Sequence, residues 1–415
     1  MFIINKRMIL FEIFVVILFF CQFRLAQKQG YILLFLEIII GFIYWIWNKR
    51  KIRMLSYPAL IYFLFIIYRI VLSLLVSGGM VDNIKTILYK ELGMFLLCVL
   101  LVQGCSRLPI IKRIRDFGVV VSILGCYELV THSSIFLPYI TVESRIYIQT
   151  LGTAKTRVQT IFMHPTICGV FMIITWFCVL FIPYKKNWKN YLSKFFVFLC
   201  LLGTQSRSCW IAFFVVNVLY MWKNYKTNKI YLNKNHFFHI CIFLIFTVIL
   251  AFIFREYIIK VFQTVVKRWL DGMDSNNAGN YNRVTMIKMG LHEWGNLDIL
   301  RKIFGAGNGY AYQLLLSNPI RGWRGAVDNQ YLTVLLDFGL VGFFLLIFLA
   351  GYIFIKTIRS SDSTYQFFGL CLLSMFISGF FYEMFSWITV TLLFCLFISI
   401  LEQKIILCNM ERDNI

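Results

Sequence analysis

The sequence contains few charged residues and only one long polar segment. Of its 415 residues, 60% are hydrophobic and only 14% are charged, and the mean hydropathy is +0.75. Soluble globular domains have about 45–50% apolar residues, so this composition excludes an ordinary soluble domain. The alternation of apolar and polar residues that marks the strands of a membrane β-barrel is also missing. The composition therefore indicates a protein built from membrane-spanning helices.

Several motifs are absent as well. No CxxC occurs, and none of the twelve cysteines lies in the one long polar segment, which argues against a metal site or a disulfide framework. No GxxxxGK[ST] motif occurs, so nothing indicates chemistry driven by ATP. The basic N-terminus precedes an apolar run without a small-residue cleavage pattern, which predicts a retained signal anchor. We expect neither a metal nor a cofactor.

Apolar runs of about 17–22 residues recur along the chain, and this is the length that the hydrocarbon core of a bilayer requires. They predict an all-α polytopic membrane protein with about twelve transmembrane helices. The predicted spans lie near residues 8–24, 31–47, 57–76, 86–103, 116–132, 161–182, 190–204, 208–222, 237–254, 330–355, 366–381 and 385–402.

The distribution of positive charge orients these helices. The net charge is +22, and 22 of the 41 Lys and Arg residues fall in the terminal segments and in the loops after even-numbered spans. Cytoplasmic loops carry an excess of Lys and Arg, so both termini are expected in the cytoplasm. Topology explains half of the basic charge, and nucleic acid is not expected as a partner. The expected division is helices 1–9 in residues 1–254, a large outer loop in 255–329, helices 10–12 in 330–402 and a cytoplasmic tail in 403–415.

The outer loop, Arg255–Asn329, carries ten Lys and Arg residues against six Asp and Glu residues. Residues 256–270 predict an amphipathic helix on the membrane surface. Residues 283–294 predict a second helix with Asn282 as its N-cap, which places Arg283 in the first turn, where the helix N-terminus favours anions. The residues expected on the buried face of this second helix are Val284, Ile287, Leu291 and Trp294.

Arginines from separate loops map to the expected outer face. Arg207 lies in a very short hairpin, which restricts its position, and Ser206 beside it adds a hydroxyl group. Arginine remains charged at any biological pH, and its planar fork of donors suits phosphate. Although each residue could be an ordinary interfacial arginine, the set together predicts a site for a diphosphate. Its members are Arg157, Arg207, Arg283, Arg321 and Arg324.

Other polar residues allow two interpretations each. Arg69 lies inside a predicted span, where it could serve the function or extend its charge to the interface. Asp337, two turns into the tenth predicted span, could pair with an arginine or take part in catalysis. Asp328 could be a general base or the N-cap of that span. His164 before Pro165 could be a fallback base in place of Asp328 or a residue that starts a helix.

Three patterns follow one another between about Arg157 and Gly342. The first is Arg157-Val-Gln-Thr-Ile-Phe-Met-His164-Pro165, and the second is the hairpin from Gly203 to Ser208. The third combines Gly305-Ala-Gly-Asn-Gly309, Asp328-Asn329-Gln-Tyr331 and Asp337 with two nearby glycines. The glycine run is similar to a nucleotide fingerprint, but no strand precedes it, so a compact turn is expected. In order and spacing these patterns resemble the O-antigen ligase/polymerase superfamily, which comprises Wzy-type polymerases and related ligases.

The resemblance implies a function at the outer face of the bacterial cytoplasmic membrane. A glycan on undecaprenyl pyrophosphate would be transferred onto another lipid-linked repeat unit, with the pyrophosphate as leaving group and no nucleotide sugar. Arg207 and Arg283 would stabilise the departing charge, and Asp328 would replace the histidine that ligases carry as base. Residues expected to contact the substrate are Arg157, His164, Ser206, Arg321, Arg324, Asn329 and Tyr331.

The aspartate at position 328 favours a polymerase over a ligase, which would transfer the glycan to a different acceptor. A flippase of lipid-linked glycan is a further alternative, although the polar residues gather at one face and not at the membrane centre. Besides the membrane lipids and the lipid-linked oligosaccharide, a chain-length regulator protein is a possible partner.

Overall fold

The computed structural model describes residues 55–76, 87–104, 107–136, 156–162, 164–226, 278–320 and 327–401. These ranges are helical and contain no strand, which confirms the all-α prediction for this part of the chain. The predicted spans near 8–24, 31–47 and 237–254, the predicted surface helix 256–270, and Arg321 and Arg324 lie outside the described residues.

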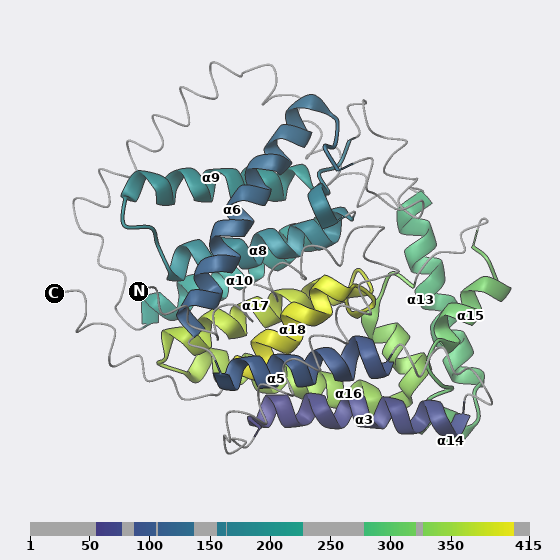
Figure 1. Cartoon of the computed structure of the whole chain (residues 1–415). Coiled ribbons are helices and arrows are strands. Elements are labelled where there is room, and N and C mark those ends of the chain that lie inside the picture. Colours follow the sequence, from purple (N-terminus) through teal and green to yellow (C-terminus); the bar gives the residue numbers. More distant parts are fainter. Residues whose placement is uncertain are drawn as a thin grey trace.

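Figure 1 shows two groups of helices joined by α17 (Ser363–Gly379). One group contains the long helices α3 and α16, and the other contains α8, α9 and α10. Helix α17 packs against members of both groups, namely α8, α10, α16 and α18. The remaining bounds are α3 Tyr57–Val76, the π-helix η1 Ile87–Gly93, α5 Met94–Gly104, α6 Arg107–Thr131, η4 Thr160–Phe162, α8 Pro165–Phe181, α9 Asn187–Gly203, α10 Arg207–Lys226, α16 Gln330–Arg359, η5 Met384–Ser386 and α18 Ile388–Ile400.

Helix α8 forms the centre of its group. Pro165 occupies the first helical position, where the missing N–H costs nothing, and His164 Nδ1 accepts the backbone N–H of Thr166 at 3.2 Å as the cap. Most of its residues are buried on every side, which is typical of a core helix and not of an amphipathic one. The start of this helix is therefore firmly positioned, and with it His164.

Two helices in the described part of the chain, Tyr57–Val76 and Gln330–Arg359, are long and apolar enough to cross a membrane. Large apolar side chains such as Leu75 on α3 and Phe348 on α16 are more than half exposed. Such exposure suits contact with lipid hydrocarbon. Helix α3 has the predicted bounds, and α16 begins at the predicted residue. The twelve-helix topology remains a prediction.

The described part of the polar loop folds into α13 (Ala278–Asn296), α14 (Ile299–Phe304) and α15 (Tyr310–Ser317). All three lie at one end of the bundle (Figure 1), which we call the loop end. Only α13 corresponds to a helix expected from the sequence.

Of the buried face predicted for α13, only Trp294 packs against the cluster that includes Met286, and the other details were wrong. The helix begins at Ala278, so Asn282 lies inside it and is not its cap. Val284 and Leu291 are about half exposed, at 51% and 49%, whereas Met286 is 4% exposed. The contact with α16 depends on Met286 and Gly290, because a glycine lets Leu332 approach the helix closely. The pattern of large apolar residues does not reveal such a small contact residue.

Helix α16 is interrupted at Gly339, whose backbone is non-helical at φ 60° and ψ −164°. The Gly305–Gly309 turn enters this break, and Gly307 N donates to the carbonyl of Asp337 at 2.9 Å. A side chain at Gly339 would clash with the backbone of Ile303 and Gly305. The compact turn predicted for the glycine run is therefore present, and it joins two backbones in direct contact.

The carboxylate of Asp337 holds the same turn. It accepts the backbone N–H groups of Gly309 at 2.9 Å and Ala311 at 2.8 Å, which satisfies the otherwise unpaired first turn of α15. Asp337 thus binds backbone groups and does not form the direct arginine pair considered from the sequence. Its function in this structure is to fix α15 to α16.

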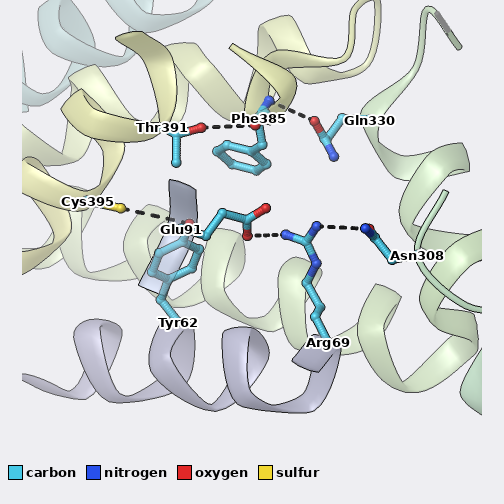
Figure 2. A network of polar contacts seen from close by, with 8 residues as sticks. All are labelled: Tyr62, Arg69, Glu91, Asn308, Gln330, Phe385, Thr391 and Cys395. Carbon is cyan, nitrogen blue, oxygen red and sulfur yellow. Dashed lines mark hydrogen bonds and ion pairs between the residues drawn. The ribbon is translucent and has the colours of Figure 1, made fainter. Parts of the chain in front are cut away.

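Arg69 secures the turn from the side of α3. Figure 2 shows its guanidinium group between the Glu91 carboxylate of η1 and the Asn308 side chain. The group also lies 4.6 Å from the centroid of the Phe338 ring. Since the Arg69 side chain is only 12% exposed, it is a buried paired arginine and does not extend to the interface.

The turn lies well along the length of both long helices. Tyr68 Oη donates to the carbonyl oxygen of Phe304 at 2.6 Å and lies 3.1 Å from that of Phe338. Tyr68 is eight residues from Val76, and Phe338 is eight residues from Gln330, so each lies about 12 Å from its helix end at 1.5 Å per residue. The distances along α3 and along α16 therefore place the turn at the same depth below the helix ends. Irregular backbone at this depth is acceptable because protein surrounds it.

Candidate functional site

The loop end of α16 begins with a side-chain cap. Asn329 Oδ1 accepts the backbone N–H groups of Tyr331 and Leu332, both at 3.0 Å. Its Nδ2 donates to the carbonyl of Phe380 at 3.1 Å, which ties α16 to the end of α17. The cap that the sequence allowed at Asp328 is therefore formed by Asn329, because Asn329 directly precedes the first helical residue. Asp328 is left for another interaction.

Asp328 forms an ion pair with Arg283 of α13. The Arg283 Nε donates to Asp328 Oδ2 at 3.1 Å, and the two side chains are 39% and 23% exposed. Burial raises the pKa of the Asp328 carboxyl, while the positive charges of Arg283 and then Arg157 oppose this rise. A second arginine therefore acts on the same carboxylate from a distant part of the sequence.

Arg157 is fixed on the hairpin between α9 and α10. Its Nε donates to the carbonyl of Thr204 at 3.0 Å, and Nη2 donates to that of Gln205 at 3.4 Å. The neighbouring backbone N–H of Val158 donates to Gly203 at 2.9 Å. The hairpin is tight enough to place Gln205 at φ 50°. These carbonyls orient the guanidinium fork with little freedom.

The segment after Arg157 is held by a buried carboxylate that sequence reasoning missed. Glu128 of α6 accepts the backbone N–H groups of Gln159 at 3.1 Å and Thr160 at 2.9 Å, and also the Ser134 hydroxyl. Gln159 is 1% exposed, and its side-chain amide has no hydrogen-bond partner among the described residues. Buried amides are normally satisfied, so Gln159 is suited to contact a bound molecule. In the sequence, its position two residues after Arg157 was the feature that could have indicated Gln159 as a site residue.

His164 packs against the aromatic turn between α17 and α18. Arg157 and Arg283 both act electrostatically on its imidazole. The ring stacks on Tyr382 with centroids 4.4 Å apart and lies 5.1 Å from Trp387. Tyr382 and Trp387 were not predicted as site residues, because nothing in the sequence connects the turn after α17 with the start of α8.

The other predicted residues surround this group. Ser206 is buried, and its hydroxyl contacts those of Thr166 at 3.2 Å and Ser208 at 3.0 Å. Tyr331 donates its hydroxyl to the carbonyl of Phe376 at 2.9 Å. Arg207 is the first residue of α10 and is partly exposed. The structure thus pairs Arg283 with Asp328, uses the neighbouring Asn329 as the cap of α16, and holds Arg157 on the hairpin, with Ser206 in that hairpin and Tyr331 in α16 making hydrogen bonds of their own.

The gathered groups define a class of site. Two arginines and a partly buried carboxylate at one end of an all-helical bundle can bind an anion and accept a proton beside it. In the described ranges, no group of three His, Cys, Asp or Glu side chains is arranged to hold a metal ion. The geometry therefore suits an anionic ligand, in a bundle whose described part is helical.

The comparison with known families makes this class specific. Residues 192–347 match the family model described as O-antigen ligase, which confirms the resemblance to the O-antigen ligase/polymerase superfamily. The matched range contains Arg207, Arg283 and Asp328. Together with the apolar helices, the match suggests an integral membrane protein with glycan transfer of the ligase or polymerase type. No curated protein matches the chain.

Proposed function

We propose that the protein is a polysaccharide repeat-unit polymerase at the outer face of the bacterial cytoplasmic membrane. The donor is a glycan on undecaprenyl pyrophosphate, and the acceptor is the terminal sugar of another lipid-linked repeat unit. The observation that carries the proposal is the ion pair between Arg283 and Asp328, beside which the positive charge of Arg157 also lowers the pKa of the carboxyl. Cations and a candidate base lie together there, as transfer from a diphosphate requires.

The arginines bind the diphosphate and stabilise its charge as it leaves. Arg157 is held by the hairpin carbonyls, so its charge is already in position before the reaction, and this is the source of electrostatic catalysis. Arg283 donates a second fork from α13, and Arg207 adds positive charge at the start of α10. Arg321 and Arg324 belong to the same proposal, since they follow α15 in the sequence and precede Asp328.

Asp328 acts on the acceptor. It takes the proton from the acceptor hydroxyl as that oxygen forms a bond to the anomeric carbon of the donor. The bond between this carbon and the pyrophosphate oxygen breaks, and the electron pair leaves with undecaprenyl pyrophosphate. Bound pyrophosphate competes with Asp328 for Arg283, and its negative charge raises the basicity of the carboxylate. The donor therefore prepares the base for the acceptor.

The decisive experiment is an analysis of lipid-linked intermediates in cells that lack the protein. A polymerase predicts that the ladder of long chains disappears while single repeat units are still made and transferred. Restoring the gene restores the ladder, and the Arg283→Ala gene does not.

A ligase is the second candidate, because the matching family model is described as O-antigen ligase. It predicts a different result in the same cells, in which long lipid-linked chains accumulate and no glycan reaches its final acceptor. That result would replace the polymerase with a ligase while leaving the diphosphate site unchanged.

The break in α16 is of the kind found in transporters, whose discontinuous helices bind substrates near the membrane centre. Here the protein's own groups occupy the break, since Asp337 binds the N-terminus of α15 and Arg69 binds Glu91. This arrangement favours a structural function for the break, and a flippase remains the less favoured alternative. A chain-length regulator protein is the expected partner of a polymerase.

A further inference from the structure

We propose that Trp387, together with Tyr382, forms a platform that binds a sugar ring of the lipid-linked glycan. The inference rests on the proposed function and adds a carbohydrate subsite beside the diphosphate site. It assigns a role to the turn between α17 and α18, which contributes none of the charged groups described above.

The turn is fastened to the start of α16 by two contacts and to α18 by a third. The backbone N–H of Phe385 donates to Gln330 Oε1 at 3.0 Å, and Thr391 donates its hydroxyl to the carbonyl of Phe385 at 3.0 Å (Figure 2). Asn329 adds the bond to the Phe380 carbonyl. The same short stretch, residues 328–330, thus carries the candidate base and holds the aromatic turn in place.

The orientation of the two rings is also fixed. Trp387 Nε1 donates to the Tyr382 hydroxyl at 3.0 Å, which satisfies the polar edge of the indole and leaves its ring faces for packing. Both rings contact the imidazole of His164, on which Arg157 and Arg283 act. Trp387 is partly exposed. A partly exposed indole at the edge of a diphosphate site is available to a group attached to that diphosphate.

A pyranose is the group that fits this position by its chemistry. The first sugar of the glycan is bonded directly to the diphosphate, so it must lie next to the arginines when the diphosphate is bound. One face of a pyranose presents C–H bonds with partial positive charge, and the face of an indole carries the negative part of its quadrupole. The large rigid ring of Trp also provides contact area with little loss of side-chain entropy.

The test compares two ligands on the full-length protein in lipid nanodiscs. One is undecaprenyl pyrophosphate without sugar, and the other is the same carrier with its glycan, extracted from cells that lack the protein. Trp387→Ala should weaken binding of the glycan-bearing lipid about tenfold, within the range of one aromatic contact. Binding of the bare carrier should stay the same, and Trp387→Phe should recover most of the affinity.

Trp188 supplies a matched control, because it is an exposed tryptophan at the far end of α9 from the hairpin. Trp188→Ala should leave both affinities unchanged. An equal loss for both ligands in Trp387→Ala, or an unchanged affinity for the glycan-bearing lipid, would overturn the platform. If the unaltered protein binds neither lipid, the diphosphate site itself is contradicted, which is distinct from the loss of sugar recognition alone.

Discussion

The ion pair between Arg283 and Asp328 joins two groups that the proposed reaction uses at different moments. The arginine is only partly buried, and the carboxylate retains access to solvent. The ion pair holds both side chains in place while both stay partly exposed. In a fully buried pair, separating the two charges would be very costly. The pair is therefore suited to be opened by a substrate.

Removing the arginine should abolish polymer formation. We expect Arg283→Ala to lower the rate of chain extension by at least about a hundredfold, because it deletes a preorganised donor to the leaving group. Arg283→Lys should also be poor, since a point charge does not reproduce the fork. The measurement is the length distribution of glycan in cells with equal amounts of membrane-inserted protein.

Arg301→Ala is the control for this variant. Arg301 is an exposed arginine of the same loop, 57% exposed and paired only with Asp298 in the part of the chain described. Normal chain lengths are expected from it. Chains of normal length in Arg283→Ala would remove Arg283 from the mechanism.

The base is tested by Asp328→Asn. The variant keeps the size of the side chain but cannot accept a proton, and a loss of about a hundredfold or more is expected. Because burial raises the pKa of Asp328, the activity of the unaltered protein should rise with pH through a value above that of an ordinary aspartate. The remaining activity of the variant should lack this acid limb. A pH profile of extension in membranes measures both effects.

Asn329→Asp provides the matched control, since Asp and Asn cap helices about equally well. Asn329→Asp should keep the cap of α16 and the amount of folded protein, although it loses the donor to Phe380. The folded state favours the protonated form of Asp328, so any stability linked to this group is present at low pH and lost as the pH rises. Asp328→Asn should therefore remain folded at neutral pH. Full activity of Asp328→Asn would assign the base to another group.

At the scale of helices and turns, the interruption of α16 decides where the loop end is held. Gly339 adopts φ 60° and ψ −164°, a conformation that residues with a side chain rarely adopt. The Gly305–Gly309 turn fills the interruption and lies between α14 and α15 in the chain. The backbone contact between the Gly305–Gly309 turn and Gly339 therefore supports the charged site from a distance.

A methyl group at this point should displace the turn. Gly339→Ala is expected to lower the melting temperature in detergent and reduce activity, because its Cβ would meet the backbone of Ile303 and Gly305. Gly351→Ala in the same helix is the control, since a Cβ there meets nothing within 4 Å. Alanine in a helix interior is preferred over glycine by about 1 kcal/mol, so this control should be neutral or more stable. Equal behaviour of the two variants would show that the break tolerates a side chain.

The pair of Arg69 and Glu91 should be more important for stability than any surface pair. Its side chains are 12% and 7% exposed, and leaving one charge of a buried pair without its partner costs about 3–5 kcal/mol. Arg69→Met or Glu91→Gln should therefore lower thermal stability strongly, and the double variant should lose less than the sum of both. The exposed Asp298→Asn should change stability by less than about 1 kcal/mol. Additive losses in the double variant would contradict the coupling.

At the scale of the whole molecule, the proposal requires the loop end to face away from the cytoplasm. A cysteine at exposed Lys288 of α13 should react with a membrane-impermeant maleimide in intact cells. A cysteine at Lys186, exposed before α9 at the other end of that helix from the hairpin, should react only after the cells are opened. The unaltered chain gives the background of its own cysteines. The reverse pattern would place the site in the cytoplasm and exclude the reaction proposed here.

The sequence predicted what depends on local pattern. The apolar run of α3 ends at its predicted bounds, and α16 starts at Gln330 because a polar stretch stops there. The sequence did not decide between Asp328 and Asn329 as cap, since both residue types suit the position. It also did not reveal Gly339 as a break, because glycine is common in apolar helices.

Contacts between distant segments were the least predictable part of the site. The arginines were expected at one face from the charge pattern alone, and the structure pairs Arg283 with Asp328 while the charge of Arg157 also lowers the pKa of that carboxyl. The support from Glu128 and the aromatic turn at Trp387 depend on tertiary packing. A buried carboxylate near a helix end and a Trp near a span end each have an ordinary explanation when only the sequence is considered.

The contact between Gly305 and Gly339 bears on how this chain can vary during evolution. A side chain at Gly305 would meet the backbone of the α16 interruption, and a side chain at Gly339 would meet the backbone of Ile303 and Gly305. Both glycines also have positive φ. A single substitution at either position is unfavourable, and a second one at the other position does not compensate for it. Distant relatives that keep this arrangement should therefore retain both glycines, and those that have lost one should have lost the other along with the turn.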